Sequence, residues 1–261
     1  MPAANLIRRL GNELYKFAFP IYRPLYSAFK NYADRAERDL LLRQIKPGSV
    51  IVDAGANIGI YSQFFSKCVG PTGFVHSFEP DPTNFLRLRQ SLADTPNVRL
   101  NELALSDKTE ASLLYTSDHL NVDHRAYPIE GEPRRVVNIQ AVALDDYFTR
   151  EERVDLIKLD IQGYELHALQ GAERIISDNP QINLLVEFWP YGLRCAGASE
   201  KDLVAFLRDK GFQCFLVTNG VLTPCPEPSA DPDDPDDYFN LFARRSGSIR
   251  TSAMASNLFS D

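Results

Sequence analysis

The sequence predicts an α/β fold in which a doubly wound, mostly parallel sheet of seven strands ends in an antiparallel C-terminal hairpin. Three observations predict it. Short apolar runs alternate with segments of helical spacing from residue 50 to about 210. The first run leads into a glycine-rich turn, which is typical of a strand followed by a helix. The last two runs, 213–217 and 238–244, have no helix between them and are expected to pair as the hairpin.

The composition limits the class of protein. The chain has 261 residues, of which 44% are hydrophobic and 24% charged, and this suits one soluble domain of α/β size. A net charge of −7 argues against a nucleic-acid partner. The four cysteines form no C-x-x-C pair, so neither a zinc site nor a disulfide framework is expected. No apolar run of 18 residues and no signal-peptide pattern is present, so we expect a cytoplasmic protein.

Three regions are expected along the chain. Residues 1–45 form an N-terminal helical extension, 46–245 form the main domain and 246–261 form a disordered tail. Within the main domain, residues 109–152 break the simple alternation of strands and helices. We interpret them as an inserted flap beside the substrate, although a plain surface hairpin has the same pattern.

The N-terminal segment 1–30 is aromatic and basic. Part of it has helical spacing, and Pro20 and Pro24 are expected to interrupt the pattern. The favoured interpretation is a helical lid packed on the main domain. Weak contact with a membrane surface through the same residues is the alternative.

The most informative segment is 50–62, with the sequence VIVDAGANIGIYS. Three apolar residues lead into Asp53, and then Gly55, Asn57 and Gly59 alternate with small or apolar residues. Glycine lets a ligand approach the backbone, and the helix that follows begins with unpaired N–H groups. The order D-x-G-x-N-x-G differs from the dinucleotide pattern G-x-G-x-x-G, and a carboxylate at the strand end repels phosphate. The turn therefore suits a ligand with an amine and hydroxyls, unless it binds no ligand at all.

A second strand is expected over residues 73–79. It ends in Glu79, which lies 20 residues after Gly59. Nucleotide-binding α/β folds hold ribose hydroxyls with an acid at this position, because two carboxylate oxygens match two vicinal hydroxyls. A helix cap is the alternative role for this residue.

Ligands of open α/β sheets bind beyond the carboxyl ends of the strands. Each of five predicted strands has an acid within a few residues of this end. The candidate stretches are 53–59, Glu79, 104–107, 160–165 and 187–191.

In combination, these stretches resemble the FkbM family of class I S-adenosylmethionine (SAM)-dependent methyltransferases. The resemblance covers about residues 48–190, with Gln162 where the family often has an acid and Tyr164 where it often has alanine or serine. The matching segments are 53–62 (DAGANIGIYS), 78–82 (FEPDP) with Asn84 and Phe85, 104–107 (ALSD), 144–146 (LDD) and 158–165 (KLDIQGYE), completed by Gly171 and Glu187.

The resemblance implies a Rossmann-like class I methyltransferase fold, with residues 46–245 as the SAM-binding domain. It implies that the turn after the first strand holds SAM, that Glu79 binds the ribose, and that Ser106 and Asp107 lie near the adenine. The cofactor-binding residues expected on this basis are Asp53, Gly55, Ala56, Asn57, Gly59, Tyr61, Glu79, Pro80, Asn84, Ala104, Leu105, Ser106, Asp107 and Asp160.

Methyl transfer to a hydroxyl needs an aligned acceptor and a base that takes its proton. Asp160 is the first candidate for the base, followed by Lys158, Glu165 and Glu187. Asp160 could instead hold the SAM ammonium. A divalent ion on Asp160 and Glu187 is a further alternative that is not favoured, and no metal ligands are assigned.

Two histidines, His119 and His124, lie in the flap and could reach an acceptor. Exposed loop histidines, however, usually have no such role. The sequence gives no sign of the oligomeric state.

These motifs lead to one functional expectation and two alternatives. We expect O-methylation of a small molecule or sugar, in natural-product or glycan biosynthesis, as the FkbM resemblance implies. The first alternative is N-methylation of an amine or a peptide side-chain amide. The second is a non-catalytic scaffold with a SAM-binding fold, but it predicts loss of the turn glycines or of Glu79, and these are present.

Overall fold

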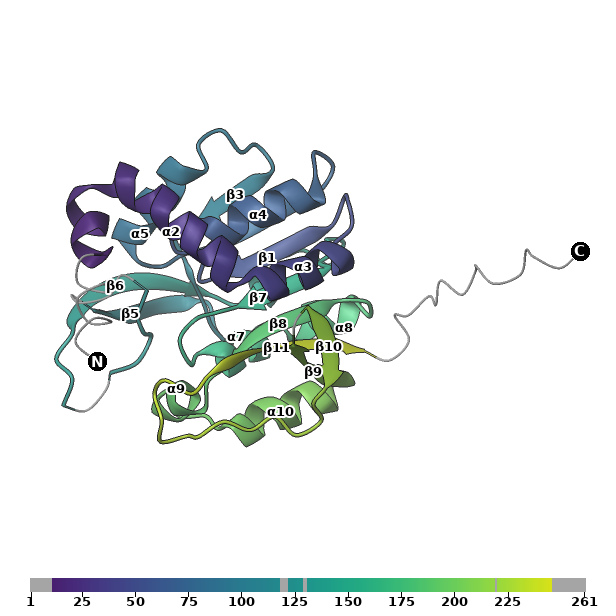
Figure 1. The fold of residues 1–261 in the computed structure, drawn as a ribbon. Coiled ribbons are helices and arrows are strands. Elements are labelled where there is room, and N and C mark those ends of the chain that lie inside the picture. The colour runs from purple at the N-terminus through teal and green to yellow at the C-terminus, as the bar shows by residue number, and fades with distance from the viewer. Residues whose placement is uncertain (1–10, 118–121, 129–130, 219, 246–261) are drawn as a thin grey trace, which may run out of the picture.

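The computed structural model describes residues 11–117, 122–128, 131–218 and 220–245 (Figure 1). The expected tail over 246–261 and the flap histidine His119 lie outside these ranges.

The main sheet has eight strands in the order β10-β9-β11-β8-β7-β1-β2-β3 (Figure 1). The strands β3, β2, β1, β7 and β8 are parallel, and β11, β9 and β10 are antiparallel. The mostly parallel sheet with antiparallel C-terminal strands is therefore confirmed. The bounds are β1 Val50–Ala54, β2 Phe74–Phe78, β3 Val98–Asn101, β7 Leu156–Leu159, β8 Asn183–Phe188, β9 Phe212–Thr218, β10 Val221–Pro224 and β11 Phe239–Arg245.

The edge strand β10 is the strand that the sequence analysis did not expect. It forms a hairpin with β9, whereas β11 returns to lie between β9 and β8. The predicted antiparallel pairing of the two final long strands is confirmed, but they do not form the expected hairpin with each other, because β10 lies between them in the sequence. The short segment 221–224 contains a proline and is mostly exposed, as is common at a sheet edge, so it lacks the apolar signal of a central strand.

Helices cover both faces of the main sheet (Figure 1). On one face, α3 (Arg35–Gln44) and α4 (Ile60–Val69) pack on Ile51, Leu156 and Leu185. On the other face, α7 (Glu165–Gln170), α8 (Glu173–Asp178) and α10 (Glu200–Asp209) cover the larger apolar cluster. Two further helices, α5 (Pro82–Ser91) and α9 (Pro190–Cys195), follow β2 and β8.

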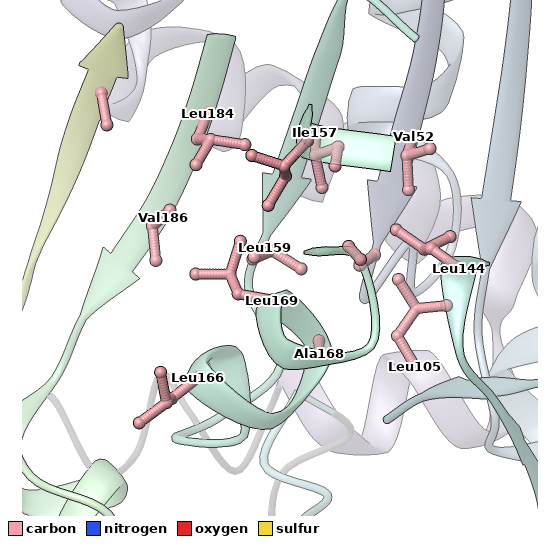
Figure 2. Packing of buried hydrophobic residues seen from close by; sticks show 14 of the residues in the cluster. Val52, Leu105, Leu144, Ile157, Leu159, Leu166, Ala168, Leu169, Leu184 and Val186 are labelled. Carbon is pink, nitrogen blue, oxygen red and sulfur yellow. The ribbon is translucent and has the colours of Figure 1, made fainter. Parts of the chain in front are cut away.

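Alternation along the strands divides the core between the two faces. Figure 2 shows Val52, Ile157 and Leu184 from three neighbouring strands pointing towards Leu169 of α7. Their sequence neighbours point to the opposite face, because side chains alternate along a strand. The same rule places every second residue of β1, β7 and β8 on the face that carries the polar site described below.

The segment after β7 forms two helices, α7 and α8, which are separated at Gly171. A Cβ on Gly171 would lie 2.0 Å from the carbonyl oxygen of Ser106, so the backbone of the 104–107 segment passes directly against it. This approach requires glycine, which ends the first helix.

The helix α2 (Phe19–Ala33) corrects one prediction about proline. Pro20 lies in the first turn, where its missing N–H has no helical partner to lose. Pro24, however, lies inside the helix and does not interrupt it. It cannot donate to the carbonyl of Pro20, but both residues are exposed, so water can supply that hydrogen bond.

The insertion forms a second, three-stranded sheet in the order β4-β6-β5 (Figure 1). Its strands are β4 (Ala104–Leu105), β5 (Glu110–Thr116) and β6 (Arg135–Val142), and the short helix α6 (Leu144–Tyr147) follows. The strand β3 of the main sheet ends at Asn101, and the chain then crosses into this second sheet, where β4 begins at Ala104.

The N-terminal helical residues pack on the turn that follows β1. Tyr15, Phe19 and Tyr22 form an apolar cluster with Ile58 and Ile60. This contact holds α2 over the carboxyl end of the sheet, and its role as a lid stays a prediction. In the part of the chain that the structure describes, no helix is long and apolar enough to cross a bilayer.

Candidate active site

A cavity of about 940 Å³ opens at the carboxyl ends of β1, β2, β7 and β8. Its walls come from the strand ends, α2, the insertion and the segment before β11. The structure brings twelve of the expected site residues into these walls: Gly55, Ala56, Asn57, Tyr61, Glu79, Pro80, Asn84, Ala104, Leu105, Lys158, Asp160 and Glu187. The remaining expected residues, Asp53, Gly59, Ser106, Asp107 and Glu165, are not among the lining residues.

The turn after β1 needs its glycines and Asn57. Gly55, Asn57 and Gly59 all have positive φ angles, of 74°, 50° and 88°. Glycine adopts such angles without strain, and asparagine tolerates them better than most residues do. A Cβ on Gly55 would lie 1.9 Å from the carbonyl oxygen of Asp160. The turn after β1 and the loop after β7 are therefore in direct backbone contact, and only glycine allows it.

Glu79 is a buried carboxyl group at the end of β2. Its Oε2 accepts a hydrogen bond from Asn57 N at 2.8 Å, and its Oε1 accepts one from Asp81 N at 3.0 Å. Burial raises the pKa of Glu79 to about 8, with a further increase from Asp81, while the two backbone donors oppose it. The side chain is thus fixed beside the turn, on the wall of the cavity.

A row of polar side chains crosses one face of the main sheet. Asp53 on β1 pairs in register with Ser77 on β2 and with Lys158 on β7, so these three share a face. Lys158 pairs with Leu185 on β8, and Glu187 lies two residues further on, opposite Asn240 of β11. Because alternate residues share a face, Glu187 and Asn240 belong to the same row. Five adjacent strands therefore supply one polar surface beside the cavity.

Lys158 is the cation of this row. Its Nζ lies 3.2 Å from Asp160 Oδ2 and 3.7 Å from Asp53 Oδ1. Burial opposes its charge, but Asp160, Asp53 and Glu37 outweigh burial and raise the pKa of Lys158. Lys158 is therefore a fixed positive charge and not a base for neutral solution.

Asp160 follows β7, and 41% of its side chain remains exposed in the cavity. Burial alone would raise the pKa of Asp160, but Lys158 and Lys30 outweigh it and hold this pKa below its usual value. Asp160 therefore stays ionised and is a weak base. Its position and charge suit the recognition of a cationic group.

Glu187 differs from Asp160 in its surroundings. It is buried in the cavity wall, and its Oε2 accepts a hydrogen bond from Gln162 Nε2 at 3.3 Å. Burial, Asp160 and Glu165 raise the pKa of Glu187 well above its usual value, and Lys158 only partly opposes this increase. Glu187 is thus the carboxyl group in the cavity wall best suited to take a proton.

Glu165 lies behind the loop after β7. Its Oε1 accepts hydrogen bonds from Ile161 N at 3.0 Å and Gly163 N at 3.2 Å, and Tyr127 Oη donates to the carbonyl of Gln162 at 2.6 Å. Burial raises the pKa of Glu165 to about 7, although the backbone donors oppose it. The structure gives Glu165 a positioning role, since it is fully buried and holds the loop that carries Asp160.

Ser106 and Asp107 lie next to the cavity wall formed by Ala104 and Leu105. Ser106 Oγ donates to Asp107 Oδ1 at 3.0 Å, and the backbone of this pair contacts Gly171. Asp53 also lies behind the wall, where its Oδ2 accepts a hydrogen bond from Ser62 Oγ at 2.6 Å.

Glu37 of α3 is a site residue that the sequence analysis missed. It is buried, and it accepts hydrogen bonds from Tyr61 Oη and, at 2.5 Å, from Asn240 Nδ2. Burial raises its pKa, although both donors lower it. Leu40 and Leu41 follow three and four residues later, so Glu37 lies on the apolar side of α3. A carboxylate on the apolar side of a helix was the sequence signal that could have identified Glu37.

The flap histidine His124 lies in the cavity wall. Its Nδ1 accepts a hydrogen bond from Ser117 N at 3.1 Å, and its Nε2 lies 4.0 Å from Asp81 Oδ1. Burial lowers the pKa of His124, which favours the neutral ring. Within the described residues, no group of three or more His, Cys, Asp or Glu side chains is arranged to hold a metal ion.

The chain is similar to known methyltransferases. Residues 53–214 match the model of the methyltransferase FkbM domain. The 2-O-methyltransferase NoeI of Sinorhizobium fredii (strain NBRC 101917 / NGR234) is 26% identical, over 66% of this chain and 75% of that protein. The 31-O-demethyl-FK506 methyltransferase FkbM of Streptomyces tacrolimicus is 25% identical, over 65% of this chain and 74% of that protein.

A solved structure of a methyltransferase FkbM from Methylobacillus flagellatus KT is 20% identical, with a TM-score of 0.47. The match covers 76% of this chain and 44% of that one, so this chain spans less than half the length of that protein. The domain match includes the turn after β1, Glu79, Asp160 and Glu187 and extends over more than half of the sequence. The chain therefore belongs to the FkbM family of SAM-dependent methyltransferases.

Proposed function

We propose that this protein transfers a methyl group from SAM to a hydroxyl group of a small-molecule or sugar acceptor. The observation that carries the proposal is Glu187, a buried carboxyl group with a raised pKa in the wall of the cavity. A hydroxyl acceptor must lose a proton as its oxygen is methylated, and the ionised form of Glu187 is a stronger base than an ordinary carboxylate because burial raises its pKa.

The residues of the cavity fit SAM. Glu79 offers two carboxylate oxygens, which can accept hydrogen bonds from the ribose hydroxyls. Phe78 and Leu105 give an apolar wall that suits the adenine. Asp160 presents a negative charge that suits the ammonium group of the methionine part. When bound, SAM supplies an electrophilic methyl group on a sulfonium, which does not need further activation by the protein.

The chain's own residues then have three tasks. Asp160 and Glu79 orient the cofactor. Glu187 receives the proton of the acceptor hydroxyl as the new C–O bond forms and the sulfonium C–S bond breaks. Lys158 stays charged beside Asp160 and Asp53 and so keeps the polar row in place. The lid formed by α2 covers the cavity and helps to exclude water from the reacting groups.

The curated relatives support the choice of oxygen. The names of both FkbM and NoeI specify transfer to an oxygen atom. The two names point to different acceptors, so they favour O-methylation as the shared reaction without identifying the acceptor of this chain. We further propose that this reaction belongs to natural-product or glycan biosynthesis.

The test is a comparison of matched acceptors. The purified protein is incubated with SAM carrying a labelled methyl group and with pairs of sugars that differ only in a hydroxyl or an amine at one carbon. O-methylation predicts label in the hydroxyl member of a pair, at a rate that falls strongly in Glu187→Gln. Label in the amine member alone would replace this proposal by N-methylation. Binding of SAM without transfer to any member would favour the non-catalytic scaffold.

A further inference from the structure

Four large apolar side chains are exposed around the mouth of the cavity. Leu25 and Phe29 of α2 are 58% and 61% exposed, Val122 of the insertion is 40% exposed, and Tyr238 before β11 is 57% exposed. All four line the cavity. We call these four residues the apolar rim.

The apolar rim is assembled from three distant parts of the chain. Its members come from α2, from the flap and from the segment that leads into β11. Single exposed apolar residues are common on protein surfaces, but a group that converges on one cavity marks a binding groove. The convergence therefore indicates a ligand that covers these side chains.

One helix extends the apolar rim along the surface. Ile21 is 58% exposed and lies one helical turn before Leu25, which in turn lies one turn before Phe29. Residues four apart form a continuous ridge on a helix, and the eight helical steps from residue 21 to residue 29 span about 12 Å. The only charged residues of α2 are Arg23 and Lys30, which do not belong to this ridge.

The side chains deeper in the cavity are polar and charged, in contrast to the apolar rim. Glu187, Lys158 and Asp160 from the main sheet make that end polar and charged. A ligand that fits both ends has hydroxyl groups at one end and an apolar group at the other. Such a ligand places its hydroxyl near Glu187 and its apolar group on the rim.

We propose that the methyl acceptor is an amphiphile, with a hydroxylated head in the cavity and an alkyl or similar apolar chain on Leu25, Phe29, Val122 and Tyr238. This inference rests on the proposed function, because it assigns the acceptor end of the same cavity. It adds the chemical class of the acceptor and the residues that select it.

The test uses alkyl glycosides that share one sugar head and differ in chain length. Methyl, octyl and dodecyl glucosides are titrated into the SAM-loaded protein below their critical micelle concentrations. Trp189 is the single tryptophan of the chain and lies in the cavity wall, so its fluorescence reports binding, with calorimetry as the second measurement. Burial of one CH₂ group strengthens binding by up to about fourfold. We expect the octyl glycoside to bind at least about tenfold more tightly than the methyl glycoside.

The variant Leu25→Ser/Phe29→Ser should remove most of this chain-length dependence. Both side chains are exposed, so the substitutions should not unfold the protein. Leu86→Ser is the matched control, since Leu86 is exposed on α5 and is not among the lining residues of the cavity. It should bind the three glycosides as the original protein does.

Equal binding of the three glycosides, or unchanged chain-length dependence in Leu25→Ser/Phe29→Ser, would overturn the proposal. A dimer that dissociates in the same variant would also overturn it, because the rim would then be an interface between copies; light scattering tests this. Titration of SAM alone keeps the two proposals apart. If the protein does not bind SAM, the proposed function is contradicted. If it binds SAM but shows no effect of chain length, only the amphiphilic acceptor is contradicted.

Discussion

Asp53 on β1 and Lys158 on β7 face each other across two neighbouring strands, with 3.7 Å between Asp53 Oδ1 and Lys158 Nζ. Both side chains are buried, and among the described residues Asp53 Oδ1 has no hydrogen-bond donor. Lys158 also lies 3.2 Å from Asp160, which is in the cavity wall. Lys158 therefore lies between the buried carboxyl group of Asp53 and the carboxylate of Asp160, which we assign to cofactor recognition.

Removing one member of this pair should leave an uncompensated buried charge. We predict that Lys158→Met lowers the free energy of unfolding by about 3–5 kcal/mol, measured by urea denaturation. The double variant Asp53→Asn/Lys158→Met should lose less than the sum of its two single variants, because the second substitution removes the unpaired charge. Additive losses would show that the two side chains do not stabilise each other.

Much of this site could be predicted because its residues lie in local patterns. The glycines and Asn57 after β1 and the acid after β2 have fixed spacing from a strand end. Asp160 and Glu187 follow strands in the same way, and the family resemblance includes both of them. Glu37 and Asn240 could not be assigned in this way, because their partners lie far away in the sequence. Their contact joins α3 to β11 across about 200 residues.

The division of roles among the acids also depended on the folded structure. The sequence analysis ranked Asp160 first as the base, but the nearby Lys158 and Lys30 lower its pKa, whereas burial raises the pKa of Glu187. The edge strand β10 and the break between α7 and α8 also depend on contacts between separate parts of the chain. One depends on pairing with β9, and the other on the backbone of Ser106 against Gly171.

The substitution Glu187→Gln should slow methyl transfer without weakening SAM binding. A general base contributes about 10²- to 10⁴-fold to a rate, and we expect kcat to fall within this range. Because Glu187 must lose its proton to act, kcat of the original protein should rise with pH, and this rise should be absent in the variant. Glu227→Gln, at an exposed acid, is the control. A variant with unchanged kcat and pH profile would assign the base to another group.

The substitution Gly55→Ala should disrupt the turn after β1. Its Cβ would meet the carbonyl oxygen of Asp160 at 1.9 Å, and φ is positive there. Gly197→Ala is the matched control, since φ is +84° but no atom lies within 4 Å of the added Cβ. We expect a loss of about 1 kcal/mol in the control from backbone strain, and a further loss of about 1–3 kcal/mol in Gly55→Ala from the clash. Similar losses measured by thermal unfolding would show that the close approach is unimportant.

The pKa of Glu165 makes stability depend on pH. Burial raises its pKa in the folded protein to about 7 from the usual value of 4.5, so the unfolded chain ionises first as the pH rises. The stability that the neutral carboxyl provides is complete below about pH 4.5 and is lost as the pH approaches 7. Relative to Glu165→Gln, the original protein should lose about 3 kcal/mol over this interval. A constant difference between the two proteins would mean that Glu165 is already ionised in the folded state.

The most direct test of the central claim is a calorimetric titration of SAM into the protein, with NAD as the control ligand. We expect micromolar binding of SAM, no binding of NAD, and an affinity for SAM that falls about ten- to a hundredfold in Glu79→Ala, since the variant loses two hydrogen bonds that contribute about 0.5–1.5 kcal/mol each. The exposed-acid variant Glu102→Ala should bind SAM normally. Failure of the folded protein to bind SAM, or equal affinity in Glu79→Ala, would contradict the cofactor site described at the carboxyl ends of β1 and β2.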